Sequence, residues 1–248
     1  MCRWNRRHFA KISAAAALLP PSTAHAFHEC EDIDIPRDKK GEDCIVGIAS
    51  HRFRHVRAVQ DSMFGSWAAT MQMIFAGNGY YIDQQDIARQ TFTKDEIEKL
   101  GSTVGHGDVQ DPFDLMNSMK HREYIDQSEN VFSVRLTYFG ADLGTATRNA
   151  KIIIRQMDNE IPMVYCSDSH MMALIGVSYI ERPDVPYPQL TGGWVADPFV
   201  GEAMAEDLQP GLRDLEWEEI TPESLDGRLV FIARVYVTGG SRSRRRKS

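Results

Sequence analysis

The sequence lacks several features that would define a function. No run reaches the roughly 18 apolar residues that a membrane-spanning helix needs, and the longest candidate, residues 12–19, falls far short. No metal-ligand motif is present, because His51 and His55 stand four apart without a third ligand nearby. Gly105-His106-Gly107 does not form a phosphate loop, and no internal repeat is visible. We therefore expect no transmembrane segment, no metal and no cofactor.

Basic side chains are scarce in the body of the chain. Of the 28 lysines and arginines, four lie in residues 1–26 and five in residues 241–248. The remaining 19 face all 35 acidic residues, so the body carries a net charge near −16. Such a charge argues against nucleic-acid binding. Residues 241–248 have the opposite character and are predicted to form a short, disordered basic tail.

The first 26 residues are predicted to be an export signal. The run Asn5-Arg6-Arg7-His8-Phe9-Ala10-Lys11 resembles the twin-arginine consensus, and a short alanine-rich apolar stretch follows it. Ala24-His25-Ala26 fits a cleavage site before Phe27. We therefore expect a periplasmic or secreted protein, with the twin-arginine route favoured over the general secretory route. Residues 27–240 then form one domain of ordinary size.

Four cysteines occur in the chain, and Cys2 leaves with the signal. Cys30 and Cys44 flank a polar segment with few apolar residues. In an oxidising compartment these two cysteines are expected to form a disulfide that stabilises this segment. Cys166 remains, and we interpret it as a small buried residue, because at strand rise it lies about 13 Å from His170.

The order of secondary structure predicts an α+β fold, with helices first and strands later. Residues 27–50 look irregular apart from a brief strand at 44–48, and residues 101–111 and 181–193 are predicted to be loops. Hydrophobic periodicity predicts helices at 66–76, 82–90, 94–100, 112–120 and 145–159. It predicts strands of an antiparallel sheet at 131–139, 162–165, 171–179, 194–196 and 230–237.

Four polar residues occur in an order that carries more information than any of them alone. Gln60 precedes Ser66 by six residues, and Ser66 opens the run Ser66-Trp67-Ala68-Ala69-Thr70. His170 lies within an apolar strand pattern, and Asp197 is followed by Pro198. This series resembles the active-site skeleton of compact bacterial papain-like cysteine peptidases, of the bacteriocin-processing type, over roughly residues 56–201. The resemblance implies a papain-like fold, in which a helical half carries the nucleophile and an antiparallel sheet half carries the histidine.

The resemblance also implies a role for each residue. Gln60 would support the oxyanion, His170 would act as the base, and Asp197 would orient His170. Ser66 occupies the position of the attacking cysteine, at a helix N-terminus whose dipole lowers the pKa of a thiol. The run Met63-Phe64-Gly65-Ser66-Trp67 keeps only the tryptophan of the papain signature, because both of its cysteines are absent.

Each residue also has an ordinary structural explanation. Serine is a good helix N-cap, which would account for Ser66. A histidine in an apolar strand is commonly a structural residue, and Asp197-Pro198 is a common start for a turn. Gln60 taken alone indicates nothing.

Three interpretations of function follow. In the first, the chain is a catalytically impaired papain-like protein that binds a peptide or a protein partner, because a serine hydroxyl cannot form the thiolate–imidazolium pair. In the second, Ser66, His170 and Asp197 form an active hydrolase, since such sets recur on unrelated folds. In the third, the serine was introduced in place of a native cysteine. The sequence favours impaired chemistry and leaves the peptide specificity and the oligomeric state open.

Overall fold

A computed structural model describes residues 26–35, 39–49, 53, 55–61, 65–97, 112–139, 148–168, 170–199, 211–221 and 226–239. The predicted export signal, the basic tail and the loop at 101–111 lie outside these residues. In chain order the elements are β1 (Phe27–Ile35), β2 (Lys39–Gly47), α3 (Gly65–Gly77), α4 (Gln84–Thr91), α6 (Pro112–Met119), β3 (Glu123–Ile125), β4 (Val131–Phe139), α7 (Arg148–Asp158), β5 (Met163–Ser167), β6 (His170–Glu181), β7 (Gln189–Ala196), β8 (Leu212–Asp214), α8 (Trp217–Ile220) and β9 (Leu229–Gly239).

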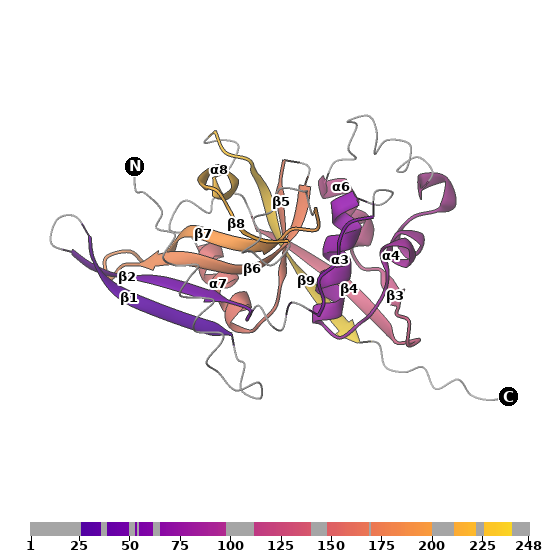
Figure 1. The fold of residues 1–248 in the computed structure, drawn as a ribbon, viewed down its shortest axis with the longest axis horizontal. Helices are drawn as coiled ribbons and strands as arrows, with labels where there is room; N and C mark the ends of the chain where they lie inside the picture. Colours follow the sequence, from indigo (N-terminus) through magenta and orange to yellow (C-terminus); the bar gives the residue numbers. More distant parts are fainter. Residues whose placement is uncertain are drawn as a thin grey trace.

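The strands form a nine-stranded antiparallel sheet with β6 at a branch point (Figure 1). The main path runs β1-β2-β6-β5-β9-β4-β3, and β7 pairs with β6 and β8 away from this path. The first half of β6 pairs with β5 and its second half pairs with β2, while β7 runs along its other edge. This mixture of helices and antiparallel sheet confirms the predicted α+β class.

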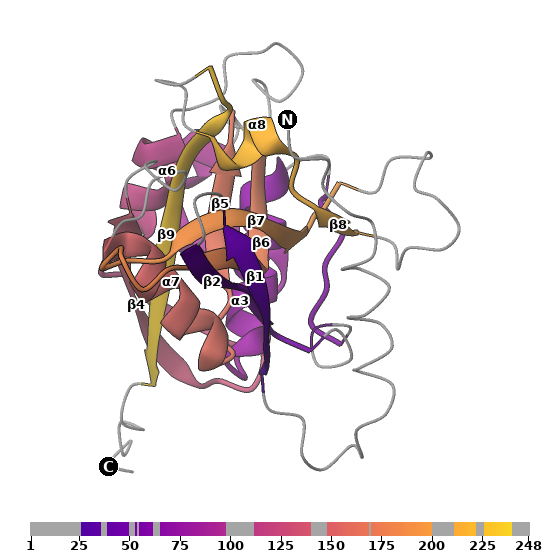
Figure 2. The same ribbon diagram turned by 90° about the vertical axis from the view of Figure 1, so that its left-hand side faces the viewer.

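Helix α3 is buried on several sides, as expected for a helix that is apolar around its whole circumference. Its Met71, Ile74 and Phe75 pack in a cluster with α4, α6, β4 and β9. Its Ala69 and Met73 pack in a second cluster with residues of β2, β6 and β7. Helix α7 covers the opposite face of β6, where Met172 and Leu174 contribute to a third cluster (Figure 2). The sheet therefore separates α3 from α7 and fixes the start of α3 relative to β6.

Two sequence predictions about irregular segments are wrong. Residues 27–47, predicted to be mostly irregular, form the paired strands β1 and β2, which reach out at one end of the molecule (Figure 1). The predicted loop at 181–193 is shorter, because β7 already begins at Gln189. The predicted disulfide is confirmed: Cys30 and Cys44 are bonded across β1 and β2, and Cys166 is a free, buried thiol.

Among the described residues, no helix combines the length and the apolar character needed to cross a membrane.

Strands β6 and β7 meet at a close contact between a glycine and a tryptophan. A Cβ atom built on Gly176 would lie 2.1 Å from the ring of Trp194, and one on Gly47 would lie 2.7 Å from the same ring. The register of β6 against β7 shifts between Leu174 and Gly176, as at a β-bulge. Phe27 stacks on Trp194 with ring centroids 5.6 Å apart. The indole thus lies against bare backbone on one side, and only glycine leaves room for it.

Replacing Gly176 by alanine is therefore expected to destabilise the fold by about 1–3 kcal/mol, because the new methyl group forces the indole out of position. Gly77→Ala is the matched control, since its Cβ would meet only Pro162 at an ordinary 3.5 Å. That control should leave the free energy of unfolding unchanged or raise it by up to about 1 kcal/mol. Urea denaturation measures both variants, and equal effects would contradict the packing argument.

Candidate functional site

The carboxylate of Asp197 is the centre of the site. Asp197 directly follows β7, and its side chain is buried. The Nε2 of His170 donates a hydrogen bond to Asp197 Oδ1 over 2.7 Å, and the backbone N–H of Phe199 donates to the same oxygen over 2.8 Å. The other oxygen, Oδ2, accepts a hydrogen bond from Arg213 Nε over 2.9 Å. The aspartate is thus fixed in orientation from three directions.

His170 begins β6 and remains accessible. About 33% of its side chain is exposed, so it is not a histidine enclosed in the apolar core. With Nε2–H directed at Asp197, Nδ1 is the ring nitrogen left to exchange a proton with another group. The arrangement therefore fixes the tautomer of His170 in the way that a base needs.

Ser66 lies in the first turn of α3, beside the start of β6. Gly65 precedes it with φ +70°, a conformation that favours glycine and lets the chain turn sharply into the helix. The backbone N–H of Met171 donates a hydrogen bond to Ser66 Oγ over 3.0 Å, across 105 residues of sequence. The serine hydroxyl is therefore bound to the residue that immediately follows His170.

Gln60 reaches the same place through its backbone. Its N–H donates to the carbonyl oxygen of Pro198 over 2.9 Å, one residue after Asp197. Gln84 of α4 holds the residues on either side of Gln60, because its amide donates to Val59 O and accepts from Asp61 N–H, each over 2.8 Å. The side-chain Oε1 of Gln60 is buried and has no hydrogen-bond partner within the described part of the chain. The glutamine is thus positioned, while one of its polar atoms remains unsatisfied.

An ion-pair network behind Asp197 was not anticipated from the sequence. Arg213 of β8 binds Asp197 through Nε and binds both carboxylate oxygens of Glu219 through Nη1 and Nη2, each over 2.8 Å. Glu219 is a buried residue of α8. It also accepts a hydrogen bond from the backbone N–H of Glu216 and thereby completes a capping box. The short helix α8 therefore carries the outer end of the network.

The network stabilises the charged forms of its members. Burial by itself would raise the pKa of the Asp197 carboxyl, but hydrogen bonds from His170 and Arg213 outweigh burial and lower it. Burial likewise opposes ionisation of Glu219, and the hydrogen bonds from Arg213 lower its pKa below the usual value. Burial also disfavours the Arg213 cation, but the two carboxylates raise its pKa. All three groups therefore remain charged at neutral pH.

The structure thus brings the four predicted residues together from separate parts of the chain. Ser66 contacts the neighbour of His170, His170 binds Asp197, and Gln60 binds the neighbour of Asp197. Arg213 and Glu219 join them, although no sequence pattern indicated either residue. An arginine and a glutamate six residues apart in a charged segment look like ordinary surface residues until the fold buries them.

Comparisons with protein-family models, with curated protein sequences and with solved structures found no match for this chain. An assignment of function therefore depends on the residues and on the geometry of the site.

Removing the cation between the two buried carboxylates tests the network. Arg213→Met is expected to destabilise the protein by about 3–5 kcal/mol at pH 7, because it leaves Asp197 and Glu219 buried without their shared partner. Both carboxyl groups have a lower pKa in the folded protein than in the unfolded chain, where it is near 4. They therefore contribute stability above about pH 4, and this contribution is lost as the pH falls through their pKa values in the folded protein. The difference between wild type and variant should therefore shrink as the pH falls toward 4 and below.

The matched control is Arg182→Met. Arg182 also binds an aspartate through two nitrogens, at 3.2 and 3.0 Å from Asp184, but this pair lies at the surface. Such a pair contributes about 0–1 kcal/mol. Urea titrations between pH 3 and 7 would count against the network if both variants behaved alike or if the loss in Arg213→Met did not depend on pH.

Proposed function

We propose that this chain is a papain-like peptidase-fold protein that binds peptides and is catalytically impaired because Ser66 stands at the nucleophile position. The observation that carries the proposal is the convergence of Ser66 and Asp197 on the two adjacent residues His170 and Met171. A structural N-cap serine and a structural histidine have no reason to meet at the same point. The order Gln60, Ser66, His170 and Asp197 is also the order that the papain-like resemblance implies.

The orientation of His170 supports a cysteine-type arrangement. In the serine protease triad the carboxylate binds Nδ1, and Nε2 faces the nucleophile. Here Asp197 binds Nε2, so Nδ1 is the ring nitrogen available to a nucleophile. The His170 ring therefore has the opposite orientation to the histidine of that triad, because its Nε2 and not its Nδ1 faces the carboxylate.

The mechanism that this geometry serves needs a nucleophile that His170 can ionise. A thiol with a pKa near 8.5 can transfer its proton to a neighbouring imidazole and remain as a thiolate, whereas a serine hydroxyl cannot form that stable pair. The Met171 N–H bound to Ser66 Oγ would stabilise a thiolate at this position. With serine at position 66, the base His170 and its orienting carboxylate Asp197 are in place, but the thiolate–imidazolium pair cannot form.

The apolar side chains beside the site favour a peptide as the bound molecule. Val59 and Phe199 are 57% and 56% exposed, and each is next to one partner of the hydrogen bond from Gln60 to Pro198. Exposed large apolar side chains beside a reactive group offer contacts to the apolar side chains of a ligand. Export through residues 1–26 to the periplasm or the outside of the cell is part of the same proposal. The Cys30–Cys44 disulfide supports it, because such bonds persist in oxidising compartments.

An active serine hydrolase is the second candidate, and the ionised carboxylate of Asp197 favours it. A carboxylate stabilises an imidazolium during proton transfer, as it does in serine hydrolases. Turnover of a peptide or ester substrate by the unmodified protein, abolished by Ser66→Ala, would establish this activity and reject the impaired form.

Restoring the thiol tests the proposed site. Ser66→Cys in a Cys166→Ala background, without residues 1–26 and so without Cys2, has one free thiol when the disulfide is intact. That thiol should titrate at a pKa of about 3.5–7.5, because His170 and the start of α3 favour the thiolate. Rates of alkylation by iodoacetamide across pH measure this pKa. His170→Ala in the same background should return it toward about 8.5. A thiol that titrates like free cysteine while His170 is present would refute the proposed arrangement.

A peptide-based thiol reagent tests the binding function separately. In the Ser66→Cys protein, a reagent with an apolar peptide portion should react faster than its short analogue, because peptide binding brings it to the thiol. Phe199→Ser should reduce the rate with the peptide reagent and leave the rate with iodoacetamide unchanged. Arg182→Ser is the control on a distant surface. Equal rates with and without the peptide portion would argue against peptide binding even if the thiol pKa is lowered.

A further inference from the structure

Arg57 lies beside the candidate site but takes no part in its network. Its guanidinium is packed against Gly211: a Cβ atom built on this glycine would lie 2.5 Å from Nε, 2.6 Å from Nη2 and 2.8 Å from Cζ of the arginine. Gly211 has φ +85°, which favours glycine, and its missing side chain leaves the room that the guanidinium fills. The carbonyl oxygen of Gly211 accepts a hydrogen bond from the N–H of Asp197 over 2.6 Å. One glycine therefore separates the guanidinium from the backbone of Asp197.

Apolar packing fixes the backbone around Arg57. The residue before it, Val56, packs against a buried cluster, and the residue after it, Ala58, belongs to that cluster. The same cluster contains Ala196 at the end of β7 and Leu212 at the start of β8. The position of the arginine is therefore set by the two strands that flank the site.

Arg57 has no counter-ion. Within the described part of the chain it makes no hydrogen bond or ion pair, and its Nε is buried without a partner. Burial lowers the pKa of Arg57, and no carboxylate acts in the opposite direction. By contrast, two carboxylates outweigh the burial of Arg213 and raise its pKa, and the hydrogen bond to Asp184 raises the pKa of Arg182. The Arg57 cation is thus partly desolvated with no charge to balance it, which costs stability unless a ligand supplies the opposite charge.

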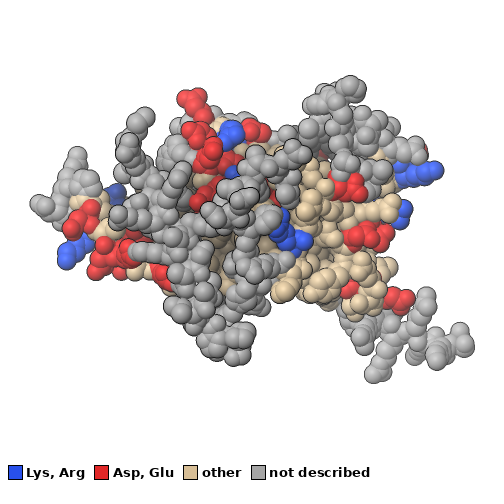
Figure 3. Space-filling model, in the orientation of Figure 1, with Lys and Arg blue, Asp and Glu red and all other residues tan. Residues whose placement is uncertain are grey.

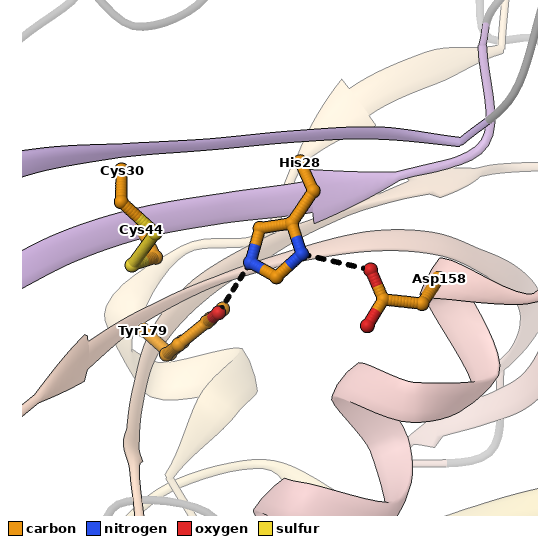
Figure 4. Close-up of a disulfide and its surroundings, with 5 residues drawn as sticks. All are labelled: His28, Cys30, Cys44, Asp158 and Tyr179. Carbon is orange, nitrogen blue, oxygen red and sulfur yellow. Dashed lines mark hydrogen bonds and ion pairs between the residues drawn. A yellow bond between two sulfur atoms is a disulfide. The ribbon is translucent and has the colours of Figure 1, made fainter.

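Other polar side chains of similar burial are partnered. Arg234 of β9 also has a buried Nε without a partner, but its Nη1 donates to the Tyr236 hydroxyl over 3.0 Å, and its Cζ lies 3.7 Å from the centroid of that ring. His28 of β1 has a partner on each ring nitrogen, Asp158 and Tyr179, beside the disulfide of the hairpin (Figure 4). A half-buried arginine that is wholly unpaired therefore differs from these groups.

The outer edge of the guanidinium reaches solvent. Nε is buried against Gly211, whereas Nη1 and Nη2 are not buried and have no partner among the described residues. The N–H groups at this end of a guanidinium match the two oxygens of a carboxylate. Val59, two residues after Arg57, and Phe199, two residues after Asp197, are exposed apolar side chains of the same region. The region thus offers one cation and an apolar surface.

We propose that Arg57 binds a carboxylate of the peptide ligand, supplied by an acidic side chain or by the C-terminus, and that Val59 and Phe199 contact the apolar residues next to it. The inference rests on the proposed peptide-binding function and adds a preference among peptides. Acidic side chains are visible at both ends of the molecule in Figure 3, and the body carries a net charge near −16. Such a body repels an acidic peptide at long range. A preference for a carboxylate must therefore come from a local cation that has no counter-ion of its own.

Protection of an introduced thiol measures peptide binding at the site. The protein is the Ser66→Cys, Cys166→Ala variant without residues 1–26, and the readout is the rate of alkylation by iodoacetamide in the presence of octapeptides. The reference octapeptide contains only leucine, phenylalanine, alanine and glutamine and is acetylated and amidated, so it carries no charge. One series replaces each position in turn by glutamate, and one further peptide has the reference sequence with a free C-terminal carboxylate. At least one of these peptides should protect the thiol at an about 10-fold lower concentration than the reference, because hydrogen bonds between charged groups are the stronger ones.

Substitutions of Arg57 connect this preference to the arginine. Arg57→Met should abolish the preference and leave protection by the neutral reference unchanged. Arg57→Lys should keep part of it, because an ammonium group binds a carboxylate as a point charge. Arg182→Met is the matched control, since this arginine already binds Asp184 and should not affect the preference. Urea denaturation without peptide should show Arg57→Met to be at least as stable as the parent, because the substitution removes a buried nitrogen that has no partner.

The outcomes separate this inference from the peptide-binding proposal. Equal protection by charged and neutral peptides, or a preference that survives in Arg57→Met, would overturn the inference and leave peptide binding itself standing. A clear loss of stability in Arg57→Met would assign the arginine a structural role instead. No protection by any of the peptides would overturn both the inference and the proposed function. A preference confined to the free C-terminus identifies the end of the ligand as the source of the carboxylate, and one confined to a glutamate position identifies an acidic side chain.

Discussion

The buried carboxylate of Asp197 is the constraint around which this end of the fold is organised. A buried charge is tolerated only when it is paired and hydrogen-bonded, and Asp197 meets this condition through His170, Arg213 and the Phe199 N–H. These partners come from the start of β6, from β8 and from the residues that follow β7. The network continues through Arg213 to Glu219, so α8 also depends on it. Removing the charge would leave His170 and Arg213 without the partner that they share.

Stability alone does not explain such a network. Buried ion pairs are often no more stable than well-packed apolar side chains of similar size, because the cost of desolvation offsets the attraction between the charges. Apolar residues at positions 197, 213 and 219 together would suit a purely structural role equally well. What an apolar residue cannot do is fix one carboxylate oxygen toward His170 while keeping the carboxylate charged. The network therefore orients His170 in addition to pairing the buried charges.

The sequence predicted those parts of the fold whose signal is local. The apolar run after Gly65 predicted α3, alternation predicted the strand at 131–139, and a continuous apolar run predicted the strand at 171–179. Strand β1 left no such pattern, since six of its nine side chains are exposed and four are acidic. Its structure comes from pairing with β2 and from the disulfide. The same distinction applies to the site: the resemblance carried four residues, whereas Arg213 acquires its role only through tertiary burial.

The site around Asp197 and the β1–β2 hairpin adjoin opposite ends of one strand. His170 and Met171 begin β6, where the strand pairs with β5, while Tyr179 lies near its other end, where the strand pairs with β2. Between them, Gly176 and Trp194 fix the register of β6 against β7. Opening the disulfide would loosen the edge formed by β1 and β2, but the first half of β6 would keep its pairing with β5 and β7. Opening the disulfide should therefore leave the strand pairing at the start of β6 intact, because β2 pairs with the second half of β6.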